Sequence, residues 1–506
     1  MLDKLQLFLI LTLTILLLLL LTSPTWAQPP EQASLVTGTA STAGFLLLLP
    51  LGLILFLSSS LPDAEKIAPQ AAASAFVVWG VAVLAYFGAG FAFQFGGLSV
   101  SNPHPDFAEL YWNWSPLDAS FGTGWGMIGL RGWALLGPAA TPGVYDLFLR
   151  HVALLGVTVV APTFILYRRA KVWMLLAFGL LSGTLLYPLA GNWLWSAGWL
   201  ANLGVNLQLG HGFVDAGMAL PFVIAGAATL AALLVFRRNE LRVTNDELRM
   251  TKDELRTTND EGQMTNDKLV TRNSSFVTQM PAAHLPLLSF FGLGMILWSW
   301  AFIASGQHIP AAVEFAMPRA ALNGILAAFS AAVLAALYSR FTTAQFNPLM
   351  TSRGALAGLI LLSAAAPFVS PWQAVAAGGV AGLLLPLFIY LIDHTLKLDD
   401  HTGGVATFGV MGVLGWLLVG LLADGSSGVG WNNVGMETYL SVGGQGVSGL
   451  LAAPGYVPDW PAQMNAQLLG AVSIVAWAML VAGGMFKIGV WLMRRREEKT
   501  PEAEEA

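Results

Sequence analysis

Apolar residues fall into long blocks of about 20 residues, separated by short polar breaks. Each block is long enough to cross roughly 30 Å of hydrocarbon as an α-helix. A block such as Val172–Leu189 does not alternate apolar and polar positions, as a strand of a membrane barrel would. The pattern therefore predicts an all-α polytopic membrane protein. We expect about eleven spans, at residues 40–60, 72–97, 144–167, 172–192, 212–236, 284–306, 318–339, 354–371, 374–396, 404–423 and 465–489.

Basic residues gather on one side of these spans. The loops on the other side carry few basic residues, such as Arg131 and Arg319. Cytoplasmic loops are the ones enriched in Lys and Arg, so the bias predicts that the N-terminus lies outside and the C-terminus inside. Ends on opposite sides of the membrane require an odd number of spans, and eleven is odd. The basic side holds Arg168, Arg169, Lys171, Arg237, Arg238, Arg340, Arg353, Lys397, Lys487 and Arg494–Arg496.

Composition agrees with a membrane bundle. The 506 residues are 56% hydrophobic and 10% charged, whereas a soluble domain carries about a quarter charged residues. The absence of cysteine excludes disulfides, iron–sulfur clusters and thiolate chemistry. The net charge of -5 says little, because nearly half of the charged residues lie in one loop and at the C-terminal tail.

The N-terminal segment resembles a secretory signal. A short charged start is followed by an apolar run to Leu21 and by small residues before Gln28. We expect residues 1–27 to be a signal peptide cleaved after Ala27, with an uncleaved first span as the alternative. The membrane domain then covers residues 28–492, and residues 493–506 form a cytoplasmic tail.

A cytoplasmic insert at residues 237–281 interrupts the membrane domain. Its apolar positions are spaced five and two apart, so no continuous coiled-coil seam forms. We favour an expanded, solvated insert over a partner-binding coil. The insert contains four near-copies of one seven-residue unit, Val243–Arg249, Met250–Arg256, Thr257–Gln263 and Met264–Val270.

Several motifs, in order along the whole chain outside the signal and the insert, resemble the ammonium transporter (Amt/Rh) family. They are the glycine-aromatic run Ala85–Phe93, the segment Leu186–Trp195, Gly210–Gly217 (GHGFVDAG), Leu398–Gly404 (LDDHTGG) and Ala466–Gly470 (AQLLG). The resemblance implies two inverted halves of five helices plus a C-terminal helix, with a substrate path between the halves near the bilayer midplane.

The resemblance also implies a homotrimer in the plasma or inner membrane, with one narrow pore in each protomer. The expected substrate is ammonium or ammonia, and the surroundings are the lipid bilayer. In the family, an external cation site and an aspartate precede a phenylalanine gate and two facing pore histidines. Ammonium is attracted to aromatic faces, but burying the bare cation is costly. No nucleic-acid partner and no cofactor are expected.

Two residues match the family at the outer end of the pore. Asp215 stands at the family aspartate, where it can cap the fifth helix, attract ammonium through its field, or do both. Trp195 stands at the external aromatic position, with an interfacial membrane anchor as the alternative.

The pore core departs from the family. Phe222 and Phe408 fall at the two histidine positions, so the side chains that could carry a proton inside the pore are replaced by rings without donors or acceptors. Their bulk could close a narrow lumen.

The gate positions are changed as well. Leu154 and Ala301 fall at the two gate phenylalanines, and Arg150 and His151 replace the Phe-Gln pair just before Leu154. Near the pore mouth Arg150 would repel ammonium unless it is paired. Asp215 is a candidate partner, and snorkelling of Arg150 to the outer surface is the alternative.

Three functions remain open from sequence. The first is ammonium or ammonia transport, the second a non-conducting or altered homologue that senses ammonium or supports assembly, and the third a conduit for a gas or small neutral solute. We expect no enzyme, because no catalytic constellation is found. Asp399 and Asp400 are interpreted as a helix cap rather than a metal pair.

Overall fold

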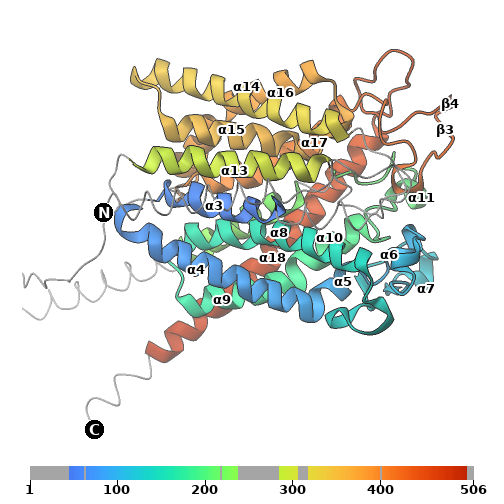
Figure 1. Cartoon of the computed structure of the whole chain (residues 1–506), viewed down its shortest axis with the longest axis horizontal. Helices are drawn as coiled ribbons and strands as arrows, with labels where there is room; N and C mark the ends of the chain where they lie inside the picture. Colours follow the sequence, from blue (N-terminus) through green and yellow to red (C-terminus); the bar gives the residue numbers. More distant parts are fainter. Residues whose placement is uncertain are drawn as a thin grey trace, which may run out of the picture.

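The computed structural model describes residues 45–61, 64–216, 219–237, 284–305, 317–398, 400 and 402–497. Within these residues the chain forms a bundle of long helices with small hairpins at one end (Figure 1). The first half comprises α3 (Leu48–Ser58), α4 (Ala64–Ala85) continued by η1 (Tyr86–Gly90), α5 (Phe91–Phe95) and α6 (Leu98–Ser101), α8 (Pro142–Leu166), α9 (Val172–Leu181) continued by η5 (Ser182–Leu186) and α10 (Tyr187–Trp195), and the helix Leu220–Arg237.

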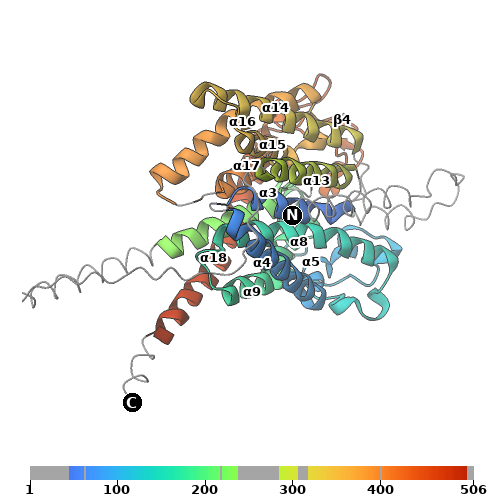
Figure 2. The same ribbon diagram turned by 60° about the vertical axis from the view of Figure 1, so that its left-hand side comes forward.

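The second half repeats this composition of long apolar helices. It comprises α13 (Leu285–Ser305), α14 (Met317–Thr343), α15 (Pro348–Ser363), α16 (Pro371–Tyr390) continued by η8 (Leu391–Thr395), and η9 (Val405–Val410) continued by α17 (Met411–Leu422). The last helix, α18 (Ala462–Glu497), runs obliquely past the others in both views (Figures 1 and 2).

Every predicted span overlaps one of these helices. Among the described residues, nine helices are long and apolar enough to cross a membrane, and two shorter apolar helices, α3 and α15, account for the other two predicted spans. The predicted polytopic helical class is thereby confirmed. The signal segment 1–27, the insert beyond Arg237 and the tail beyond Glu497 lie outside the described residues.

Small residues let the helices approach closely. A Cβ added to Gly378 or Gly358 would lie 2.3 or 2.4 Å from the carbonyl oxygen of Ala327. Such contacts bring α14, α15 and α16 together, as small residues commonly do between membrane helices. In the first half, a Cβ on Gly90 of η1 would lie 2.0 Å from the carbonyl oxygen of Gly183 in η5. Two π-helical turns are therefore held backbone to backbone beside the site described below.

The segments between the spans are largest at one end of the bundle. There β1 (Asn113–Trp114) pairs antiparallel with β2 (Ile128–Gly129), and β3 (Thr438–Tyr439) pairs with β4 (Val442–Gly443). The short helices α7 (Asp118–Phe121) and α11 (Leu203–Leu207) lie at the same end, on the right in Figure 1. The C-terminal end of α18 projects from the opposite end.

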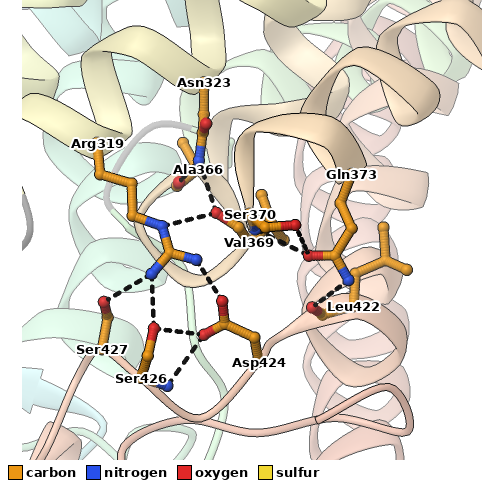
Figure 3. A network of polar contacts seen from close by, with 10 residues as sticks. All are labelled: Arg319, Asn323, Ala366, Val369, Ser370, Gln373, Leu422, Asp424, Ser426 and Ser427. Atoms are coloured by element: carbon orange, nitrogen blue, oxygen red, sulfur yellow. Dashed lines mark hydrogen bonds and ion pairs between the residues drawn. The ribbon is translucent and has the colours of Figure 1, made fainter. Parts of the chain in front are cut away.

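A polar network fixes the second half at this end (Figure 3). Arg319 of α14 pairs with Asp424, which follows α17, and donates to the carbonyl oxygen of Val369 before α16. Asn323 donates to the same carbonyl and to that of Ala366. Because three connections share these bonds, the starts of α14 and α16 and the end of α17 are held in one arrangement.

Candidate functional site

Two buried aspartates cap the helices that carry the pore positions. Asp215 accepts from the backbone N–H groups of Ala219 (3.2 Å) and Leu220 (2.9 Å), at the start of the helix Leu220–Arg237. Asp400 accepts from Gly404 (3.0 Å) and Val405 (2.7 Å), at the start of η9. Both carboxylates reach the fourth and fifth residues ahead, which satisfies amides that a helix start leaves unpaired.

The cap predicted for each aspartate is thus present. Burial raises the pKa of Asp400, while the bonds from Val405, Gly404 and Thr402 and the nearby Arg353 guanidinium oppose that shift. Asp399 lies outside the described residues. Among the described residues no cluster of three or more His, Cys, Asp or Glu side chains could hold a metal ion.

Phe222 and Phe408 face each other across the junction of the two halves. Their rings are parallel within 2°, with centroids 6.1 Å apart, and each side chain is about 1% exposed. The backbones meet beside them, because a Cβ on Gly226 would lie 2.2 Å from the backbone nitrogen of Gly409. Phe408 lies on η9, a π-helical turn of the kind often found at functional sites. The structure therefore brings together two residues that are 186 positions apart in the sequence.

A second cluster lies around His151 of α8. Its ring contacts Phe95 (centroids 4.7 Å apart, edge to face), Trp195 (5.3 Å) and Tyr187 (6.1 Å). Trp195 is 5% exposed and packs inward against these rings. It is therefore buried in the protein, contrary to the alternative in which it anchors the surface.

The Asp215 carboxylate belongs to the surroundings of the same cluster. It lies within electrostatic range of the Tyr187 hydroxyl, and Tyr187 in turn contacts both His151 and Trp195. The aromatic position and the aspartate singled out from sequence are thus linked through one tyrosine. Aromatic faces beside a carboxylate form an environment that favours a cation.

The segment that carries Asp215 is held by α18. Gln467 accepts from the N–H of Val214 (2.8 Å) and donates to the carbonyl oxygens of Val214 (2.8 Å) and Trp416 (2.9 Å). Gln463 accepts from the N–H of His211 (2.9 Å) and donates to the carbonyl oxygen of Gly212 (3.0 Å). Two glutamine side chains one turn apart on α18 thereby bind the backbone N–H and C=O groups of the segment that precedes Asp215. These bonds hold that segment in place.

Comparison with known proteins identifies the family of this chain. The model of the Ammonium Transporter Family matches residues 39–258 and 269–504. The chain belongs to the ammonium transporter family. It is 25% identical over 382 residues to Ammonium transporter Amt2 of Archaeoglobus fulgidus, which covers 74% of this chain and 70% of that protein. It is 26% identical to Ammonium transporter Amt1 of Haloferax mediterranei over 255 residues, 47% of this chain and 43% of that one.

Solved structures share the ammonium transporter fold. The Sensor Amt Protein superposes with a TM-score of 0.62 at 21% identity, covering 89% of this chain and 91% of that one. Candida albicans Mep2 gives a TM-score of 0.61 at 18% identity, covering 91% and 84%. The family resemblance read from the motifs is confirmed.

The gate positions differ from each other in their surroundings. Leu154 is buried in α8, one turn after His151. Ala301 of α13 is only partly buried, whereas its neighbour Trp300 is fully buried and donates to Ser363 (3.2 Å). Neither position carries an aromatic ring, so the stacked gate of the ammonium transporter family has no counterpart at these two residues.

Arg150 has a partner that the sequence analysis did not consider. Its Nε donates to Asp146 (2.7 Å), one turn earlier on α8, and the two side chains are 10% and 20% exposed. The ion pair removes the need for pairing with Asp215, and its burial is contrary to snorkelling into water. The positive charge of Arg150 is thus neutralised within its own helix.

Gln94 and Tyr86 were not predicted as site residues, and His151 was named only as a replacement just before Leu154. Each is a polar side chain inside a predicted span or its first turn, and all three are buried. Polar side chains in membrane helices are expensive and usually face a partner or a cavity. A polar residue inside an apolar span could therefore have been picked out from the sequence as a candidate site residue. Only the fold shows that these three residues meet.

Proposed function

We propose that this member of the ammonium transporter family moves ammonium or ammonia across the membrane through a pore within each protomer. The observation that carries the proposal is the outer cluster, in which Trp195 and His151 pack against Tyr187, and Tyr187 lies within electrostatic range of the capping carboxylate of Asp215. Ring faces and a negative field attract a small cation and can strip part of its hydration. The relatives' names describe ammonium transport and support the same substrate.

The deeper pore favours neutral ammonia. Phe222 and Phe408 offer neither a hydrogen-bond donor nor an acceptor, and carrying a bare cation past them would cost several kcal/mol or more. An uncharged, small molecule has a much lower barrier there. The proposed path therefore recruits ammonium at the outer cluster and passes ammonia between the two rings.

The second candidate is a non-conducting or altered-specificity homologue that senses ammonium or assists assembly. The paired phenylalanines and the missing gate rings at Leu154 and Ala301 favour it. The resemblance to the Sensor Amt Protein, at 21% identity, concerns the fold alone and does not raise this candidate above transport.

The proposal includes a location and an assembly. We place the N-terminus outside and the C-terminus in the cytoplasm of a plasma or inner membrane, on the basis of the basic loops. A cleaved signal at residues 1–27, a solvated insert at 237–281 and a homotrimer complete the proposal. No enzymatic activity is proposed for this transporter.

Reconstitution tests the function directly. Proteoliposomes are assayed for labelled methylammonium uptake and for ammonia-driven internal alkalinisation, with protein-free vesicles as the background. Transport by the wild type well above the background supports the proposal. Silence of the wild type with recovery in a Phe222→His/Phe408→His double variant would instead support the non-conducting candidate.

A further inference from the structure

Four side chains form one hydrogen-bonded network in which two of them meet at His151. The Tyr187 hydroxyl lies 2.7 Å from His151 Nδ1, and Gln94 Nε2 lies 3.2 Å from the same nitrogen. Tyr86 donates to Gln94 Oε1 (2.8 Å). The residues come from η1, α5, α8 and α10, and all four are buried.

The chain assigns the neutral form of His151. Because Gln94 Oε1 accepts from Tyr86, its Nε2 is the amide group that faces the histidine, and it can only donate. The Tyr187 hydroxyl can donate to the same Nδ1. Two donors directed at Nδ1 make it the acceptor, so the neutral ring carries its proton on Nε2.

The position of His151 relates it to the proposed path. It packs against Trp195 and precedes Leu154 by one turn of α8. Its hydrogen-bond partner Tyr187 also lies within electrostatic range of Asp215. Tyr187 therefore joins Asp215, whose field attracts a cation, to His151, which can accept a proton.

We propose that His151 is the proton acceptor of this pore and deprotonates ammonium through Tyr187. An N–H bond of ammonium breaks and its proton forms a new O–H bond on Tyr187, while Tyr187 passes its original proton to the lone pair of His151 Nδ1. The products are ammonia, an unchanged tyrosine and a singly charged imidazolium. Ammonia moves inward, and the proton returns by the reverse step to water at the outer end.

The inference rests on the proposed transport function and makes it more specific. A protonatable group lies at the outer cluster, whereas Phe222 and Phe408 in the core cannot relay a proton. The proton therefore stays on the outer side, and uptake is electrically neutral. A pore with titratable groups along its core could move charge, and this one could not.

The charges around His151 set the expected pH dependence. Tyr86 and Tyr187 face it from η1 and α10, Asp215 acts through Tyr187, and Arg150 with its partner Asp146 lies on the same helix. The neutral ring is the form that accepts a proton. Acidification fills Nδ1 and places an imidazolium beside the incoming cation, so uptake falls as pH is lowered through the titration of His151.

Histidine-labelled NMR tests the proton transfer without requiring transport. The full-length protein in nanodiscs is labelled with ¹⁵N-histidine, and the His151 signals are assigned by their loss in His151→Gln. At fixed pH, ammonium chloride is added, with potassium chloride as the matched cation. Proton transfer predicts that ammonium raises the imidazolium fraction of His151 and that potassium does not.

Tyr187→Phe keeps the ring and removes the relay, so ammonium should no longer raise that fraction. An imidazolium fraction that ammonium lowers or leaves unchanged in the wild type would overturn the inference, since a bound cation alone repels a second positive charge. His104→Gln, at an exposed loop histidine, is the control and should respond like the wild type.

Uptake assays separate this inference from the proposed function. His151→Gln and Tyr187→Phe should each reduce methylammonium uptake by about 100-fold, the lower range for a positioned acid–base group, and His151→Gln should abolish the acidic fall. Wild-type uptake that is retained in both variants refutes the relay and leaves transport standing. A silent wild type whose His151 still gains a proton from ammonium refutes transport and leaves the relay standing.

Discussion

Gly226 lies directly against the backbone of Gly409, where the two halves of the bundle meet. A Cβ on Gly226 would come within 2.2 Å of the Gly409 nitrogen and 2.3 Å of its Cα, and both are backbone atoms that cannot rotate away. The contact fixes the distance between the helices that carry Phe222 and Phe408. The spacing of the two rings is thus set by glycines rather than by the rings themselves.

Gly226→Ala is therefore expected to destabilise the protein. Overpacking of a tight core costs about 1–3 kcal/mol, and a backbone collision should fall at the upper end of this range. The measurement is thermal unfolding in detergent. Gly80→Ala is the control, because a Cβ there meets no atom within 4 Å and should leave the stability equal or slightly higher. Equal melting temperatures for the two variants would contradict the close contact.

Asp215→Asn separates the cap from the charge. Asparagine keeps one of the two acceptor oxygens and places an amide donor against the other N–H, so the melting temperature should fall, while the loss of the negative field should lower methylammonium uptake per folded molecule by at least about 10-fold. The comparison variant is Asp400→Asn, which has the same cap geometry at the other aspartate. It should keep its uptake per folded molecule. Unchanged uptake in Asp215→Asn would leave the aspartate with its structural role alone.

His211 makes the stability depend on pH. Burial lowers its pKa from 6.5 to about 4, and within the described residues neither ring nitrogen has a hydrogen-bond partner. The unfolded chain therefore binds a proton more readily than the folded one between these two values. Lowering the pH from 7 to 4 should cost about 3 kcal/mol through this residue.

The ring centroids of His211 and Tyr439 lie 4.4 Å apart. His211→Phe keeps a ring packed against Tyr439 and removes the titratable imidazole. The fall in unfolding free energy between pH 7 and pH 4 should be smaller in this variant by the amount above. His104→Gln, on an exposed loop, should reproduce the wild-type curve. Parallel curves for the wild type and His211→Phe would show that the buried ring does not titrate between those pH values.

The Arg150–Asp146 pair is expected to protect the pore mouth. Asp146→Asn leaves the Arg150 charge uncompensated on the residue next to His151, so methylammonium uptake should fall. Arg150→Gln removes that charge, and the double variant should recover uptake. A double-mutant cycle on unfolding should give a coupling of about 1 kcal/mol, because the pair is mostly buried. Equal uptake in Asp146→Asn and the wild type would speak against any electrostatic role of the pair.

The helices were predictable because the hydrophobic blocks have the length of a membrane span. All eleven predicted spans overlap a helix, including α3 and α15, which are shorter than the pattern suggested. Motif order also placed Phe222 and Phe408 at corresponding positions, and the structure brings the rings together. The helices were predicted from local hydrophobicity. The positions of the two phenylalanines were predicted from a family resemblance that extends along the whole chain.

The polar contacts were harder to predict. The partner of Arg150 is four residues away on the same helix, a spacing that the sequence already contained. It was missed because Asp215 was the more conspicuous acid. The network around His151 draws on four elements, and no periodicity shows which faces of them meet. Roles for Trp195, Asp215, Leu154 and Ala301 remain predictions that transport measurements must test.

The last helix has a consequence for how the molecule sits in its bilayer. With 36 residues, α18 is about 54 Å long, and the hydrocarbon layer is about 30 Å thick. Gln463 and Gln467 bind its first turns to the segment before Asp215, so the surplus length emerges at the other end, where Arg495 stacks on Trp491. One rigid rod thus spans from the outer cluster to the opposite headgroups. A thinner or thicker membrane must tilt that rod, and its tilt is transmitted to the outer mouth of the pore.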